Sequence, residues 1–411
     1  MYLIMSKLIS VFEHEHLTIH DKRNKGTINK TQLDKLLAFN DNHDNKYFTA
    51  IRDGVKFTEY VGVIQIGNIT IEILPKADKG DYNLWHGVLL KMLSVCKKIN
   101  LETVSDANLS KRHFSLLDLY FDRFLNEVEK LLHKGLIKKY RYRTDNVFAL
   151  KGQLQFAKNI QHNLVHQERF YTKHQTYDQE HLINQILLKA LNILSKLVSN
   201  PFLTDKIKKL QLNFPEIKEI SISKVQLDTV KLNRKSFDYS EAIQIAKMII
   251  LNYSPDIKGG NENMIALLFD MNKLWEEYIF RMLLKTPQNK FDISAQSSDK
   301  FWETKTIRPD IVLNCKVCQK PMFIIDTKWK VIKNTQPSDD DLKQMYAYNQ
   351  YWNVNKSMLL YPQVESASEK FGKYHKGNLG NSYCKLGFVS VLKDGKLNQD
   401  IGQEILLKLK N

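Results

Sequence analysis

The period of the hydrophobic pattern changes along the chain, and this change limits the folds that the chain can adopt. Residues 60–76, YVGVIQIGNITIEILPK, place alternating β-branched side chains on both sides of a Gly-Asn pair, which predicts a β-hairpin. Residues 114–132 and 183–198 instead repeat apolar side chains every three or four positions, which predicts amphipathic helices. Sheet and helix are therefore expected in separate regions.

Three regions follow from this pattern in a chain of 411 residues, a length typical of two or three domains. Residues 1–78 are predicted to form strands and turns, and residues 79–258 to be mainly helical. Residues 259–411 mix helices and strands in an order typical of an α/β domain. The polar segment 256–263, DIKGGNEN, is the expected boundary loop. We therefore expect an α+β multidomain protein.

Charge and composition narrow the class of protein. The chain has 61 Lys and Arg against 45 Asp and Glu, a net charge of +16. This charge fits a nucleic-acid partner, and it fits the Lys-rich usage of an AT-rich genome equally well. Four cysteines are too few for a disulfide framework, and no apolar run is long enough to cross a bilayer. We expect a cytoplasmic protein without a membrane partner.

The segment 307–330, IRPDIVLNCKVCQKPMFIIDTKWK, carries the most chemistry. Asp310 begins one predicted strand, and Asp326 and Lys328 lie on the next strand. Side chains two positions apart on a strand point to the same face, so Asp326 and Lys328 share one. If the two strands pair as a hairpin, Asp310 joins them at one site.

Two carboxylates and a lysine at one point suggest metal-assisted phosphodiester hydrolysis. Asp310 and Asp326 would bind Mg²⁺, which prefers oxygen ligands, and the backbone carbonyl of Thr327 could add another. Lys328 would orient the attacking water and stabilise the developing negative charge. The alternative is a surface Asp beside a solvated Lys. The apolar run 322–325 argues against that alternative, because charges embedded in a buried strand are costly without partners.

Two further side chains are candidates for the same site. Ser338 and the acidic residues after it predict a helix start, and Gln344 lies one turn before Tyr348 on that helix. Gln344 could contact Lys328 or a phosphate, or both side chains could lie on an ordinary helix surface. Glu276 borders the apolar stripe of a helix at about 272–284. Its spacing fits a carboxylate that supports the metal and an exposed Glu equally well.

A basic segment at 134–143, KGLIKKYRYR, interleaves tyrosines with positive charges. On a strand, Lys139, Arg141 and Arg143 would share one face and could contact DNA phosphates. The same pattern fits a solvated basic face, which is what most charge runs are.

Two motifs set limits on other functions. Cys315 and Cys318 form a CxxC pair, which supplies two of the four ligands of a structural zinc site and fits a plain hairpin turn as well. The sequence contains no GxxxxGK[ST], so we expect no nucleotide to be bound by this chain.

The residues at 309–310 and 326–328 resemble the motif of the PD-(D/E)xK nuclease superfamily, with Asp as the second acid in place of Glu. More specifically, the chain resembles the McrC family, the nuclease subunits of the McrBC modification-dependent restriction system. The resemblance rests on several motifs in order, among them KGQL at 151–154, YDQEHLINQIL at 177–187, LLFDMNKLWEEYI at 267–279 and IIDTKWK at 324–330.

This resemblance implies a C-terminal PD-(D/E)xK domain that cuts methylcytosine-containing DNA with Mg²⁺. It assigns catalysis to Asp310, Asp326 and Lys328, with Glu276 and Gln344 assisting. It also implies a hexameric McrB-like AAA+ GTPase partner, whose GTPase activity the chain stimulates and which contacts the β-rich region 1–78. Two alternatives remain open, a nuclease that acts in repair without a motor and a non-catalytic scaffold that activates an AAA+ ring.

Overall fold

The computed structural model describes most of the chain. The described residues are 7–21, 27–76, 82–98, 116–255, 263–330, 332, 336–363, 369, 371–375 and 382–409. The predicted boundary loop lies outside these residues except for Asn263. The chain packs into two compact units, one formed by Met1–Leu116 with Ala266–Asn411 and the other by Leu117–Ile265. The three domains predicted from the sequence remain a prediction.

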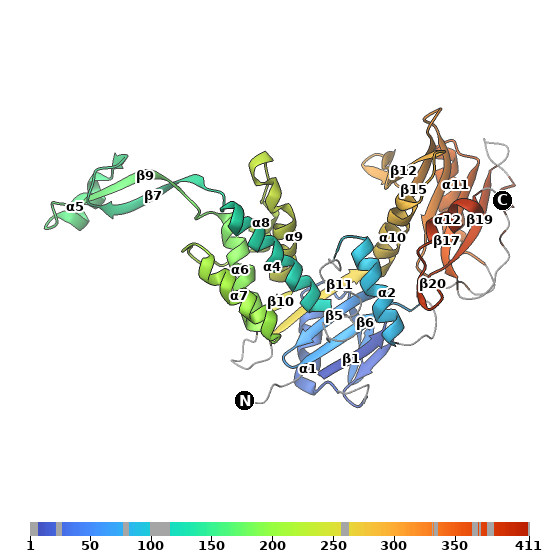
Figure 1. Cartoon of the computed structure of the whole chain (residues 1–411), viewed down its shortest axis with the longest axis horizontal. Helices are drawn as coiled ribbons and strands as arrows, with labels where there is room; N and C mark the ends of the chain where they lie inside the picture. Colours follow the sequence, from blue (N-terminus) through green and yellow to red (C-terminus); the bar gives the residue numbers. More distant parts are fainter. Residues whose placement is uncertain are drawn as a thin grey trace. The chain divides into compact units, whose positions relative to one another are not determined.

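The first unit begins with a sheet that is built around the predicted hairpin. β5 (Tyr60–Ile66) and β6 (Ile69–Leu74) pair antiparallel, and Gly67 takes a φ of 55° in the turn, so the predicted hairpin is confirmed. β1 (Lys7–Phe12) pairs parallel with β6, and β11 (Met264–Asp270) is the neighbour of β5 (Figure 1). Parallel pairing of β1 with β6 joins segments that are more than fifty residues apart.

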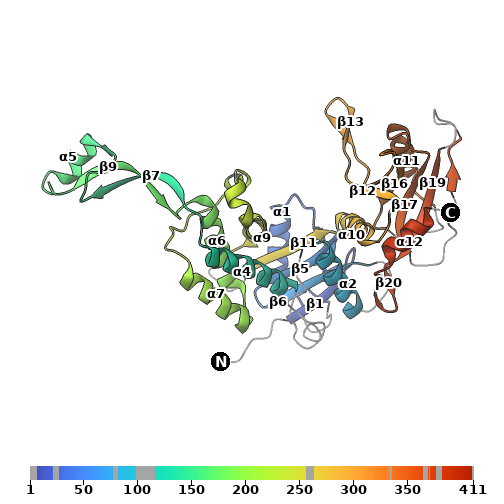
Figure 2. The same cartoon turned by 45° about the horizontal axis from the view of Figure 1, so that its top comes forward.

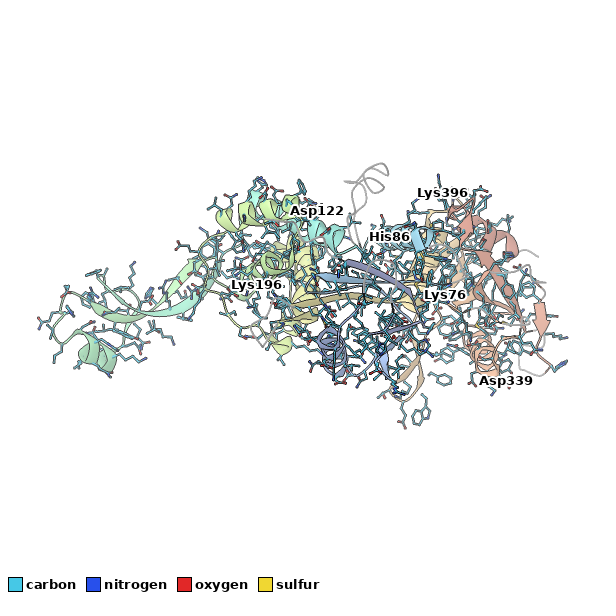
Figure 3. The ribbon with its side chains drawn as sticks, turned by 90° about the horizontal axis from the view of Figure 1, so that it is seen from below. Lys76, His86, Asp122, Lys196, Asp339 and Lys396 are labelled. Atoms are coloured by element: carbon cyan, nitrogen blue, oxygen red, sulfur yellow. The ribbon has the colours of Figure 1, made fainter. Side chains whose placement is uncertain are left out.

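Helix α2 (Tyr82–Val95) packs against β6. Every residue of β6 is buried, including Glu72, whose carboxylate lies 3.3 Å from Nδ1 of His86 on α2. His86 is labelled in Figure 3. Burial lowers the pKa of His86, but the bond to Glu72 outweighs this effect and raises that pKa above its ordinary value. Ion pairing thus lets a charged residue occupy a strand that is covered on both faces.

A second, small sheet holds β2 (His16–Thr18), β4 (Gly54–Phe57) and β3 (Phe48–Ile51) in that order. Helix α1 (Lys30–Asp41) precedes these last strands and begins with a capping box formed by Asn29 and Gln32. The expectation of strands and turns alone over 1–78 is therefore wrong at α1. The helix was missed because its apolar stripe is short, although the Asn-x-x-Gln cap was visible in the sequence.

The C-terminal part of the first unit is a six-stranded mixed sheet with strand order β12-β15-β16-β17-β19-β18. The strands of this sheet are β12 (Phe291–Ala295), β15 (Ile311–Cys315), β16 (Pro321–Thr327), β17 (Lys356–Gln363), β18 (Phe371–Lys373) and β19 (Tyr383–Ser390). Two short hairpins accompany it, β13 (Asp299–Trp302) with β14 (Lys305–Ile307) and β20 (Leu392–Lys393) with β21 (Lys396–Leu397). The β13–β14 hairpin projects from the sheet (Figure 2).

Helices cover both faces of this sheet. α11 (Asp339–Tyr351) packs through Met345 and Tyr348 on the face that carries Val312 and Ile324. α10 (Met271–Lys285) and α12 (Ile401–Lys408) pack against each other, and they contact β16 and β19 respectively. Because side chains alternate along β16, its even-numbered residues face α11. This alternation places the catalytic candidates on the α11 side.

The second unit is a bundle of helices that carries a projecting arm (Figure 1). Its helices are α4 (Leu116–Lys134), α6 (Leu182–Leu197), α7 (Pro201–Asn213), α8 (Lys224–Asp228), the 3₁₀ helix η1 (Arg234–Tyr239) and α9 (Ser240–Asn252). The short β10 (Tyr253–Ser254) pairs with the start of β11. The helices predicted at 114–132 and 183–198 are confirmed.

The arm comprises residues 139–178, which interrupt the helical region. β7 (Lys139–Val147) and β9 (Phe170–Asp178) pair along their full lengths, β8 (Gln153–Leu154) extends the sheet, and α5 (Phe156–Asn163) packs on β9. The mainly helical description of 79–258 therefore holds for the bundle and not for the arm. Among the described residues, no helix is both long and apolar enough to span a membrane.

Candidate active site

The pairing of β15 with β16 brings the two predicted carboxylates together. Ile311 lies opposite Ile325 in this antiparallel pair, so Asp310, which precedes β15, lies at the edge where Asp326 and Thr327 finish β16. The backbone N–H and the hydroxyl of Thr327 donate to Oδ2 of Asp310, at 2.7 and 3.0 Å. The hairpin predicted for these strands is confirmed, and the turn between them fixes the separation of the two acids.

Lys328 completes this cluster from the next position along the chain. Its Nζ lies 2.7 Å from Oδ2 of Asp326, a side chain that is only 1 % exposed. Its backbone N–H donates to the carbonyl of Leu360 on β17, at 2.9 Å. The ammonium group is therefore held against a buried carboxylate at the end of a central strand.

Burial and mutual repulsion perturb the titration of these groups. Burial raises the pKa of Asp310, and burial together with the charge of Asp310 raises the pKa of Asp326 to about 7. Burial lowers the pKa of Lys328, but the charge of Asp326 outweighs this effect and raises that pKa above its ordinary value. Two acids that repel each other in a buried cluster create a site that favours a cation.

A chain of hydrogen bonds runs from Lys328 to the backbone beside Asp310. Lys328 Nζ donates to Oε1 of Gln344 at 3.2 Å, and Nε2 of Gln344 donates to the hydroxyl of Tyr348 at 2.7 Å. That hydroxyl donates to the carbonyl of Arg308 at 2.8 Å. α11 therefore ties the lysine to the segment that leads into β15, and neither side chain lies on an ordinary helix surface.

Glu276 approaches the cluster from α10. Its Oε1 accepts a hydrogen bond from Nε2 of Gln296 at 2.8 Å, and its pKa is raised by burial and by the charge of Asp310. Glu277 is directed elsewhere and pairs with Lys98 at 3.2 Å. The structure thus places the first of the two neighbouring acids beside the site, on the side where the helical spacing placed it.

The donor set suits Mg²⁺, which takes oxygen ligands and keeps several waters. Asp310 and Asp326 offer carboxylate oxygens, and a bound cation would offset the burial that raises both pKa values and the charge of Asp310 that further raises the pKa of Asp326. Within the described ranges, no three His, Cys, Asp or Glu side chains converge on a metal position. The ion would therefore take further ligands from water, and the carbonyl of Thr327 stays a predicted ligand.

One contact of the segment after β16 could not be predicted from the sequence. Nε1 of Trp329 donates to Oε1 of Glu13 at 2.7 Å, although the two residues are 316 positions apart. The Trp329 ring also lies 5.1 Å, between ring centroids, from that of Trp275 on α10. Sequence reasoning found no role for Glu13, because neither periodicity nor a motif connects the two segments.

The basic residues proposed to contact DNA lie on β7, in the arm of the second unit. Arg141 donates to Asp178 at 3.0 Å and to Glu180 at 2.6 Å, and Arg143 pairs with Asp145. Both guanidinium groups are therefore engaged by acids, of which Asp145 and Asp178 belong to the arm and Glu180 follows it. A DNA-binding role for Lys139 and these two arginines remains a prediction.

The CxxC pair lies in the turn between β15 and β16. Cys315 ends β15, and its Sγ accepts a hydrogen bond from the backbone N–H of Cys318 at 3.4 Å. Hydrogen bonds from Cys318 lower the pKa of the Cys315 thiol. Among the described residues no third His, Cys, Asp or Glu joins the pair.

Comparisons with known proteins agree with this architecture. The type IV methyl-directed restriction enzyme EcoKMcrBC of Escherichia coli (strain K12) is 22 % identical over 320 residues, which are 72 % of this chain and 88 % of that protein. A solved half-complex from a tetradecameric assembly of Thermococcus gammatolerans McrB AAA+ hexamers with bound McrC matches with a TM-score of 0.66 and 17 % identity. That match covers 98 % of this chain and 100 % of the other, and it shows a shared fold.

A family model covers the chain from the N-terminal sheet to β17. It describes the McrBC 5-methylcytosine restriction system component, and it matches residues 55–362. The matched range contains both carboxylates, the lysine and the helix that carries Gln344. With three quarters of its residues matched, the chain belongs to the family of McrBC 5-methylcytosine restriction system components.

Proposed function

We propose that the chain is the Mg²⁺-dependent DNA endonuclease subunit of an McrBC-like restriction complex. The observation that carries this proposal is the buried cluster of Asp310, Asp326 and Lys328 at one edge of the sheet. Carboxylates and a lysine in this arrangement are what the superfamily motif requires. Membership of a restriction family gives the cluster a matching biological task.

Each residue of the cluster has a distinct task in this proposal. Asp310 and Asp326 hold Mg²⁺, which when bound polarises a phosphodiester and lowers the pKa of a coordinated water. Lys328 faces the same point, so its ammonium group orients the attacking water and stabilises negative charge on the phosphate. Gln344 limits the movement of that ammonium group, and Glu276 adds negative potential on the α10 side.

The substrate and the partner follow from the family and from the similar proteins. The family description names 5-methylcytosine, and the solved assembly contains McrB AAA+ hexamers with bound McrC. We extend both to this chain, which would cleave methylcytosine-containing DNA together with an AAA+ GTPase hexamer and stimulate that GTPase. The net charge of +16 suits contact with DNA.

The exposed apolar residues favour the arm as the surface that contacts the GTPase. They lie on its strands, its loops and α5, and include Tyr140, Tyr142, Phe148, Leu150, Phe156, Ile160, Leu164, Val165 and Tyr177. Over the described part of 1–78, the exposed large apolar side chain is Leu8, which at 38 % is less exposed than each of these arm residues. Clustered apolar exposure marks protein-protein contacts, so this surface competes with the region 1–78 that the resemblance implied.

Cleavage of a methylated plasmid tests the proposal. Wild type and Asp326→Ala would be incubated with Mg²⁺, alone and with the AAA+ protein plus GTP. We expect wild type to cut only with partner and GTP, and Asp326→Ala to lose about 100-fold or more of this activity while it still stimulates the GTPase. Cutting without the partner would indicate an autonomous nuclease. Equal GTPase stimulation without cutting by either protein would indicate a scaffold.

The same assay locates the partner contact. Phe148→Ser with Phe156→Ser removes apolar surface from the arm, and Val317→Ser is a matched change at an exposed position of the first unit. We expect only the arm variant to lose GTPase stimulation. Unchanged stimulation by that variant would leave 1–78 as the contact region.

A further inference from the structure

Glu13 lies at the end of the N-terminal sheet and inside the protein. Its backbone N–H donates to the carbonyl of Leu74 at 2.9 Å, which extends the pairing of β1 with β6 by one residue. The side chain is only 2 % exposed. A carboxyl group is rarely buried to this degree without a specific partner.

One oxygen of this carboxyl group makes both of its hydrogen bonds. Oε1 accepts from the backbone N–H of Lys76 and from Nε1 of Trp329, each at 2.7 Å. Figure 3 labels Lys76 just after β6. Oε2 is buried and has no hydrogen-bond partner among the described residues. Burial raises the pKa of Glu13 to about 7, so keeping this carboxylate buried costs folding free energy.

Trp329 lies two residues after the end of β16, where the chain leaves the sheet. β16 ends at Thr327, and the backbone bond from Lys328 to Leu360 is the last that joins this segment to β17. Lys328 faces α11 through Gln344, and Trp329 faces α10 through Trp275. Past the end of the ladder, the anchored indole therefore sets the path of the backbone that carries the lysine.

We propose that Glu13 is a positioning residue for Lys328 and acts through the indole of Trp329. The proposal rests on the proposed function, because it assigns a task to Lys328. The N-terminal sheet thereby contributes to the geometry of the nuclease site. Loss of the Glu13 bond frees the indole, lets the chain after β16 move, and misaligns the ammonium group without removing it.

The structure offers variants that separate positioning from folding. Trp329→Phe keeps a ring against Trp275 and removes the donor. Glu13→Gln keeps the acceptor oxygen, and Glu13→Ala removes it. Glu72→Gln is a matched control, because Glu72 is a carboxyl of the same sheet that is 5 % exposed and bonds to His86.

The experiment measures Mg²⁺-dependent cleavage of methylated plasmid by the full chain with its AAA+ partner and GTP, with Asp326→Ala as the inactive reference. We expect Trp329→Phe and Glu13→Ala to lower kcat roughly tenfold to 100-fold, with KM for DNA within about twofold of wild type, as for lost transition-state contacts. Glu13→Gln should recover most of kcat. Glu72→Gln should leave kcat per folded molecule unchanged.

A second readout does not depend on turnover. An amine-reactive reagent followed by mass spectrometry gives the labelling rate of Lys328, and we expect Trp329→Phe to raise it at least about threefold, because the amine is less restrained. Equal labelling and equal kcat in Trp329→Phe and wild type would overturn the positioning role, provided that Asp326→Ala is inactive. Cleavage that does not depend on Asp326 would instead overturn the proposed function, and the inference with it.

Discussion

At the scale of single residues, the candidate site holds buried carboxylates that cost stability and would favour a metal ion. Asp310 and Asp326 lie in one buried cluster, where desolvation disfavours both charges and each charge disfavours the other. Lys328 offsets part of this repulsion from one side. A cation at the carboxylates would offset the rest, so stability and metal affinity are expected to depend on the same two residues.

Asp326→Asn should stabilise the metal-free protein at pH 8. In the unfolded chain Asp326 loses its proton near the ordinary pKa of Asp, whereas in the folded protein Asp326 stays protonated up to about pH 7. Wild type therefore loses stability as the pH rises between these values, by on the order of a few kcal/mol, and the amide removes that loss. Thermal unfolding between pH 4 and pH 8 measures the effect.

Magnesium should make wild type more stable than Asp326→Asn, the reverse of the order without metal. It should raise the unfolding temperature of wild type and leave Asp326→Asn nearly unchanged, because the variant has lost a charged ligand. Asp292→Asn is the control, since Asp292 is exposed on β12 of the same sheet. An equal magnesium shift in all three proteins would contradict a metal site at Asp326.

At the scale of secondary-structure elements, the β13–β14 hairpin leaves the sheet beside the two carboxylates. The backbone N–H of Gln296 donates to the carbonyl of Asp310 at 2.9 Å, and Ala295 lies opposite Ile311. The hairpin therefore starts at the edge that holds the site. Its tip exposes Trp302, which is 62 % accessible, and a two-stranded ribbon fits a DNA groove.

Trp302→Ala should weaken DNA binding and leave the fold intact. Burial of an exposed apolar side chain in a groove contributes about 1.5–3 kcal/mol when it is complete and less when it is partial, so the Kd for a duplex should rise roughly fivefold or more. Val317→Ala is the matched control, because Val317 is 95 % exposed in the turn at the opposite end of β15 and β16. Fluorescence anisotropy with labelled DNA makes the comparison, and equal affinities would exclude a contact by the hairpin.

At the scale of the whole molecule, the sheet that holds the candidate site is not an independent body. Residues 1–116 and 266–411 pack as one unit. α10 packs against α2 as well as α12, and its Trp275 and Tyr278 are completely buried. Lys98 and Glu277 add an ion pair at 3.2 Å between the two parts. The chain leaves this unit and returns to it, so the nuclease domain predicted at 259–411 shares its core with the N-terminal region.

A fragment of residues 259–411 should therefore fold poorly by itself. Separation exposes the α10 surface that α2 covers and removes the Glu13 contact of Trp329, a loss of several kcal/mol. We expect a broad thermal transition and aggregation, against a cooperative transition of the full chain. Coexpression with residues 1–116 is the rescue control. A sharp transition of the fragment near that of the full chain would contradict a shared core.

Residue patterns alone predicted much of the site, because its central part is local. Asp310, Asp326 and Lys328 lie within one hairpin, where strand alternation and a short turn fix their faces. The distance from Gln344 to Tyr348 is one helical turn, and the bond between them follows from that spacing. For Glu276 the helical spacing fitted a site residue and an exposed Glu equally well, and the structure directs it toward Gln296 while Glu277 pairs with Lys98.

In the basic arm, the sequence pattern predicted the shared strand face but not the partners of the charged side chains. Alternation correctly predicted that Lys139, Arg141 and Arg143 share a strand face. It could not show that Asp178 and Glu180 pair with Arg141, because these acids come 37 and 39 residues later in the chain. Nor could it show that Tyr140 and Tyr142, on the opposite face, stay exposed.

The sequence by itself determined the family, two long helices of the bundle, the hairpin of the first sheet and the three groups proposed for catalysis. These depend on side-chain periods and motifs, which short stretches of chain encode. Tertiary structure alone decided the parallel pairing of β1 with β6, the shared core around α10 and the bond from Glu13 to Trp329. Contacts between distant segments depend on how whole elements pack, and no local pattern of side chains specifies that.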